Sequence, residues 1–305
     1  MEAVVTKKVE ESQRLQIDSV PKLTHRELLY LRASVLSASH PRLGPHKLLI
    51  EMQVGQPDRK RPLFLVGALF MAKHLPEDQP VYGLPFGSKQ ENVADYLRAL
   101  AGCYVEHIRS VQPTGPYLLC GFCAGGWTVL EMAHQLRQAG EQVGLLMMVE
   151  SRGVTRDFTF LYPIFWHLGE IGRGSLKNRF GHAAKLLTGD GLWRRLMRKR
   201  HRKEATGLLK DEVLQMWLAQ ETLRPASQAW TPPLWDGPAV YIYAQAGHFR
   251  STLYPKAGWG RFLTGAAEFV PVPGDHTTYI QEPHVHVLAQ TMQRYLERAS
   301  VEREL

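Results

Sequence analysis

The chain has 305 residues, which at roughly 150 residues per domain allows one large domain or two ordinary ones. Hydrophobic residues make up 44% and charged residues 22%, values that are typical of globular proteins and exclude wholesale disorder. No apolar run approaches the roughly 18 residues of a membrane-spanning helix, and the first residues lack the apolar core of a signal peptide. The cysteines are Cys103, Cys120 and Cys123, an odd number that predicts no disulfide framework and a reducing, cytoplasmic location.

The formal net charge of +8 is concentrated in one segment. Between Ser151 and Trp235 there are 15 Lys and Arg against 7 Asp and Glu, whereas the rest of the chain has 22 of each sign. The densest part includes Arg194, Arg195, Arg198 and Lys199. Such a face attracts an acidic partner, although a solvated helix face would have the same composition. Nucleic acid is a weaker candidate, because no zinc pattern, RRM-like aromatic motif or heptad-backed basic helix accompanies the charge.

Hydrophobic periodicity and turn residues divide the chain into elements. A polar leader over residues 1–23 precedes a helix at 28–36, which a capping box of Thr24 and Glu27 opens. The predicted strands are 47–54, 62–66, 80–84, 116–122, 143–149, 239–245 and 268–272. The predicted helices of the remaining chain are 92–111, 124–139 and 283–298.

Strands that alternate with helices predict an α/β fold with a mainly parallel sheet. The strands at 116–122 and 143–149 are almost wholly apolar, as expected of strands buried on both faces. Between Arg152 and Pro233 the sequence is helix-like and basic, with no strand pattern. We therefore expect an N-terminal extension over 1–45, a core formed by 46–151 and 236–300, and an inserted helical lid over 152–235.

The chemistry is concentrated at the sequence Gly121-Phe122-Cys123-Ala124-Gly125-Gly126, between a buried strand and a helix. This is the pattern of a nucleophile elbow, with Cys in the place of Ser. Small neighbours are needed because the nucleophile occupies a strained turn that points its side chain away from the sheet. The N-terminus of the following helix favours negative charge and so lowers the pKa of a thiol there.

Two further residues complete a candidate triad in the order nucleophile, acid, histidine. Glu150 follows the strand at 143–149, and His276 lies in the turn Pro273-Gly274-Asp275-His276 between the last strand and the last helix. A solvated glutamate at a strand end and a surface histidine are the plain alternatives. The agreement in chain order and context favours Cys123, His276 and Glu150 as catalytic residues.

Several segments resemble the thioesterase domains of nonribosomal peptide and polyketide synthases. They are Gln79–Leu84, Gly115–Leu119 through Gly140–Val143, Gly258-Trp259-Gly260-Arg261, Pro273–His276 and Glu282-Pro283-His284-Val285. The resemblance covers roughly residues 48–296. It implies an α/β-hydrolase fold, a helical lid, and an acyl chain delivered by a phosphopantetheinyl carrier protein.

The chain departs from that family at three places. Cys123 replaces the usual serine, Glu150 replaces the usual aspartate, and the His/Gly-rich loop after the strand at 62–66 is missing. That loop usually supplies one oxyanion donor. The N–H of Ala124 can supply one donor, and Gly67 or its neighbour Ala68 would have to supply the other. Loss of one such donor typically slows catalysis by about 10²–10³.

The resemblance implies a thioesterase or acyltransferase that takes an acyl, peptidyl or polyketide chain from the carrier onto Cys123. Release would follow by transfer to an amine or hydroxyl, by cyclisation, or by hydrolysis. Arg194, Arg195, Arg198 and Lys199 are the expected carrier-binding residues. We expect no bound cofactor and no metal site. The competing hypothesis is a non-catalytic member of the fold that binds a carrier protein or an acyl chain.

Overall fold

A computed structural model describes residues 49–84, 96–151, 230–246, 255–276 and 278–301. The expected helix at 28–36, the N-terminal extension and most of the expected lid lie outside these residues. In the part of the chain that is described, no helix combines the length and hydropathy needed to cross a membrane. Cys103, Cys120 and Cys123 are all free cysteines.

Seven strands form one sheet in the order β1-β3-β2-β4-β5-β6-β7. Their bounds are β1 Ile50–Gln53, β2 Leu63–Val66, β3 Val81–Leu84, β4 Tyr117–Phe122, β5 Val143–Val149, β6 Ala239–Ala244 and β7 Glu268–Val272. Only β1 runs antiparallel to its neighbour, and every other pairing is parallel. The mainly parallel sheet expected from the alternation of apolar strands and helices is therefore confirmed.

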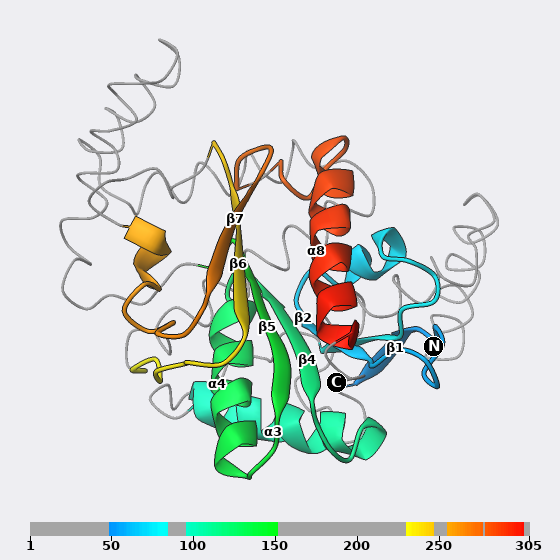
Figure 1. The fold of residues 1–305 in the computed structure, drawn as a ribbon, viewed down its shortest axis with the longest axis vertical. Helices are drawn as coiled ribbons and strands as arrows, with labels where there is room; N and C mark the ends of the chain where they lie inside the picture. The colour runs from blue at the N-terminus through cyan, green and yellow to red at the C-terminus, as the bar shows by residue number, and fades with distance from the viewer. Residues whose placement is uncertain (1–48, 85–95, 152–229, 247–254, 277, 302–305) are drawn as a thin grey trace, which may run out of the picture.

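The described helices cover both faces of the sheet (Figure 1). They are α3 Tyr96–Val111, α4 Gly125–Gln138, α8 His284–Val301 and the short 3-10 helices η2 Leu69–His74 and η5 Pro255–Gly258. On one face, α3 and α4 pack against alternate strand residues such as Phe64 and Leu119, whereas Leu65 and Cys120 pack with α8 and η2 on the other. Cys120 is fully buried, as its alternation within the strand predicts, and burial raises the pKa of its thiol.

The strands on both sides of the undescribed segment 152–229 belong to this one sheet, with β5 paired directly to β6. The described chain stops at Ser151 and resumes at Trp230, both of which are buried. The indole N–H of Trp230 donates to Oε2 of Glu131 on α4 over 2.7 Å. Trp230 and Trp235, at the end of the expected lid, thus pack in the core with α4.

Candidate active site

Cys123 lies in a sharp turn directly after β4, with left-handed backbone (φ 53°). Its N–H donates to the Val149 carbonyl at the end of β5 over 2.9 Å. A Cβ atom on Gly121 would lie 2.3 Å from the Gly125 carbonyl oxygen, and one on Gly125 would lie 2.4 Å from the Val66 carbonyl oxygen. The two glycines of the Gly-x-Cys-x-Gly pattern are therefore required by the close approach of α4 to β2 and β4.

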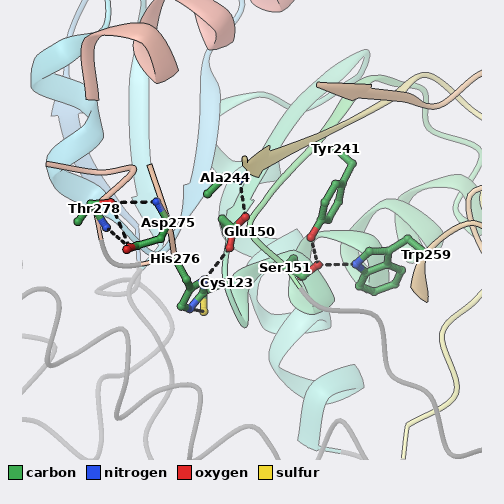
Figure 2. A network of polar contacts seen from close by, with 9 residues as sticks. All are labelled: Cys123, Glu150, Ser151, Tyr241, Ala244, Trp259, Asp275, His276 and Thr278. Atoms are coloured by element: carbon green, nitrogen blue, oxygen red, sulfur yellow. Dashed lines mark hydrogen bonds and ion pairs between the residues drawn. The ribbon is translucent and has the colours of Figure 1, made fainter. Parts of the chain in front are cut away.

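The structure brings the three predicted catalytic side chains into one line (Figure 2). His276 Nε2 lies 3.7 Å from Cys123 Sγ, and His276 Nδ1 lies 2.7 Å from Oε2 of Glu150. The Glu150 side chain is 8% exposed and that of His276 is 27% exposed. The carboxylate is thus buried behind an imidazole that solvent can reach.

Glu150 occupies a second strained turn, at the end of β5. Its φ is 49°, and its N–H donates to the Ile242 carbonyl oxygen of β6 over 2.9 Å. Oε1 of the carboxylate accepts the Ala244 N–H over 2.6 Å, which leaves Oε2 for His276. Both carboxylate oxygens therefore have a hydrogen-bond partner, one on β6 and one on His276.

A pair of buried donors holds the residue that follows Glu150. The Ser151 carbonyl oxygen accepts the Tyr241 hydroxyl over 2.6 Å and the Trp259 indole N–H over 2.7 Å (Figure 2). All three residues are at most 2% exposed. These bonds anchor the backbone on the carboxyl side of the strained Glu150, and so help to fix where its carboxylate points.

His276 is presented by a tight turn between β7 and α8. Gly274 has φ 95°, and Asp275 Oδ1 accepts the Thr278 N–H over 3.0 Å while the Asp275 N–H donates to Thr278 Oγ1 over 2.9 Å. The Tyr279 N–H closes the turn on the Asp275 carbonyl oxygen over 3.0 Å. The turn therefore holds itself in shape through local hydrogen bonds on both sides of the histidine.

The electrostatic environment raises the pKa of His276. Burial by itself would lower it, but the Cys123 sulfur and the Glu150 carboxylate together outweigh burial and raise the pKa from 6.5 to about 10. An imidazole that keeps its proton at neutral pH is suited to form an ion pair with a thiolate.

Tyr279 packs beneath this line of side chains and was not anticipated from the sequence. Its ring stacks on that of His276, with 28° between the ring planes and 6.2 Å between the centroids, and the residue is 1% exposed. Its hydroxyl is buried without a hydrogen-bond partner among the described residues. Burial raises the Tyr279 pKa well above its ordinary value, so the phenol is neutral.

The candidate oxyanion donors border the same turn. Ala124, which follows the nucleophile, is the N-cap residue of α4. Gly67 and Ala68 follow β2 in left-handed backbone, and η2 begins directly after them, as the missing loop implies. The Gly67 N–H is directed at the Leu84 carbonyl oxygen over 3.5 Å, so Ala68 N–H is the alternative second donor.

Some predicted site residues lie outside the described part of the chain, whereas other residues near the site were not predicted from the sequence because only the folded chain brings them together. Arg194, Arg195, Arg198 and Lys199, the predicted carrier-binding residues, lie outside the described residues. The Ala244 N–H donates to the Glu150 carboxylate, and the Tyr241 hydroxyl and Trp259 indole N–H donate to the Ser151 carbonyl oxygen. These contacts involve a backbone donor or acceptor, so no sequence motif reveals them. Trp259 had one signal, its place in the Gly258–Arg261 segment that carried the family resemblance.

Comparisons with known proteins place this chain near the thioesterase domains of large synthases. Residues 70–156 match the family model of the thioesterase domain. The chain is 27% identical over 268 residues to chondramide synthase cmdD of Chondromyces crocatus, covering 80% of this chain and 7% of that protein. It is 42% identical over 76 residues to a dimodular nonribosomal peptide synthase of Bacillus subtilis, covering 24% of this chain and 3% of that protein. The chain therefore spans only a small part of the length of these relatives.

Solved structures show the same architecture. The NocB thioesterase domain, in a covalent complex with a fluorophosphonate nocardicin G analog, superposes with a TM-score of 0.54 over 79% of this chain and 96% of that domain, at 22% identity. At this identity the likeness concerns the fold. The chain thus has the α/β-hydrolase fold, and its residues 70–156 are similar to thioesterase domains and to parts of peptide and polyketide synthases.

Proposed function

We propose that this chain is a thioesterase-like enzyme that takes an acyl, peptidyl or polyketide chain from a phosphopantetheinyl carrier protein onto Cys123. It then releases the chain to water, a hydroxyl or an amine, including cyclisation within the chain. The observation that carries the proposal is the line from Cys123 Sγ through His276 to Glu150, with separations of 3.7 and 2.7 Å. The similarity to synthases that build such chains supports the choice of substrate class.

In the first half-reaction the Cys123 thiolate attacks the carbonyl carbon of the carrier-bound thioester. The resulting oxyanion is stabilised by the N–H groups of Ala124 and Ala68. When the oxyanion collapses, the C–S bond to the phosphopantetheine breaks, and its sulfur leaves with the proton of the His276 imidazolium. Glu150 orients the imidazole and stabilises its charge throughout.

In the second half-reaction the neutral His276 removes a proton from the acceptor, which attacks the acyl-Cys123 carbonyl. The Cys123 thiolate departs, and the ion pair with the imidazolium is restored. Because the first step exchanges one thioester for another, it is nearly neutral in free energy. The acyl group therefore stays activated on the enzyme, so a slow or weak acceptor can still be used, and transfer or cyclisation is as well supported as hydrolysis.

The uneven charge of the chain supports a negatively charged carrier protein as its partner. Carrier proteins of this class present a phosphate on the arm, and the basic segment that contains Arg194, Arg195, Arg198 and Lys199 has the complementary sign. Neutralising these four residues is expected to raise the apparent KM for the loaded carrier and to weaken its salt dependence. A matched variant neutralises four exposed basic residues of the core, Arg59, Lys73, Lys256 and Arg294. Equal effects in both variants would contradict the assignment.

The central experiment is intact-mass analysis of the full chain after mixing with an acyl-loaded carrier protein. We expect one acyl group on the parent chain, none on Cys123→Ala, and retention on Cys103→Ser, which removes the most exposed of the three cysteines. Addition of candidate acceptors then identifies what releases the group. If Cys123→Ala still turns over, the mechanism is wrong. If the parent binds the carrier but never becomes acylated, the non-catalytic binding protein is the correct description.

A further inference from the structure

Three side chains that commonly bind metal ions meet on the surface between η2 and α8. His74 ends η2, His286 lies in the first turn of α8, and Glu282 precedes that helix by two residues. None of the three takes part in the line formed by Cys123, His276 and Glu150. The sequence did not predict the group, because His74 is far along the chain from the other two.

The separations suit a single small cation. One ligand atom from each residue lies within 4.8 Å of the other two, and His286 Nε2 is 2.8 Å from Glu282 Oε2. The rings of His74 and His286 meet edge to face, with 5.8 Å between centroids. Ligands about 2.0–2.1 Å from a tetrahedral zinc ion are about 3.4 Å apart. Small side-chain rotations therefore bring all three ligands into range.

The donor set decides which cation fits. Ca²⁺ and Mg²⁺ prefer oxygen ligands, whereas two imidazoles and one carboxylate are typical of zinc. The side chains of Glu282 and His286 are 63% and 61% exposed, so a water molecule can occupy the fourth position and the ion can enter from solvent. We propose that His74, Glu282 and His286 form a Zn²⁺ site of three protein ligands and one water.

The backbone that carries these ligands is held in place by packing. In η2, Met71 and Ala72 are fully buried, and in α8 Val285 and Leu288 are buried in the same core cluster. The ligands thus project from two elements that already contact each other. Zinc binding would cross-link η2, which follows Ala68, to α8, which follows the His276 turn. Stabilisation of the folded chain is the direct consequence.

The test is zinc titration by calorimetry on the full chain carrying Cys103→Ser and Cys123→Ser, so that accessible thiols cannot bind the metal. We expect one Zn²⁺ per chain with a micromolar dissociation constant, and a rise in melting temperature at saturating zinc. The competing hypothesis is an ion-paired surface cluster that holds no metal.

His74→Ala and Glu282→Gln should each weaken binding at least tenfold, whereas His284→Ala, which alters a neighbouring histidine, should leave it unchanged. Circular dichroism without zinc confirms that each variant is folded. A dissociation constant weaker than 1 mM overturns the proposal. So does tight binding that is insensitive to His74 and Glu282, because the metal would then lie elsewhere. Neither outcome affects the proposed role of Cys123.

Discussion

Replacement of Glu150 by glutamine tests whether the carboxylate sets the state of the nucleophile. The two carboxylate oxygens accept separate donors, the Ala244 N–H over 2.6 Å and His276 Nδ1 over 2.7 Å. A glutamine has only one oxygen, so its NH₂ group must face one of these donors. The change also removes one of the two charges that raise the His276 pKa. The His276 imidazolium, which is the partner of Cys123, should therefore become less stable at neutral pH.

The size of the effect follows from the bond that is lost. A hydrogen bond to a charged group contributes about 1.5–3 kcal/mol, which corresponds to a rate lower by about 10- to 150-fold. The assay is alkylation of Cys123 by iodoacetamide, followed by intact mass from pH 5 to 10. The parent should react readily at pH 6–7, and Glu150→Gln should lag by this factor. The difference should shrink above about pH 9, where an ordinary thiol is ionised without help.

The chain offers a matched control in Glu131, a second buried glutamate. It accepts the Trp230 indole N–H over 2.7 Å and has no contact with the line of catalytic side chains. Glu131→Gln should change stability but leave the pH profile of alkylation as it is in the parent. If folded Glu150→Gln has the parental profile, the carboxylate does not act on Cys123 through His276, and the reasoning fails.

Three further predictions concern stability, each measured by urea unfolding. Tyr241→Phe and Trp259→Phe each leave the Ser151 carbonyl with one donor, and only the double variant buries an acceptor without any donor. The double variant should therefore lose about 1 kcal/mol more of the free energy of unfolding than the two single variants lose together. Simple additivity would argue against the shared acceptor. The pKa of His276 is raised to about 10, so the contribution of its protonated form to the free energy of unfolding is complete below about pH 6.5 and is lost as the pH rises toward 10. The parent should therefore lose more stability than His276→Gln between pH 6.5 and 10. Parallel plots of this free energy against pH for the two proteins would refute the ion pair. Tyr279→Phe removes a buried hydroxyl without a partner and should raise the free energy of unfolding by about 1 kcal/mol. A loss of stability would instead show that the hydroxyl has a hydrogen-bond partner in solution.

The sequence alone determined the local part of the site. The strand β4, the turn at Cys123 and the start of α4 are contiguous, and each is specified by short-range rules: apolar residues for a buried strand, small residues for a strained turn, and helical periodicity after it. Strand β5 was predicted with the bounds Val143–Val149 that the structure has. The chain order of Cys123, Glu150 and His276 could be predicted for the same reason, since each follows a recognisable strand.

Tertiary structure alone decided which atoms meet. The distance from His276 to Cys123, the approach of Gly125 to the Val66 carbonyl, and the two donors on the Ser151 carbonyl all join segments that are distant in sequence. Residue type and periodicity report which face of an element is apolar, but not how two elements are rotated or spaced. Those quantities arise when side chains pack at high density, so only the folded chain determines them.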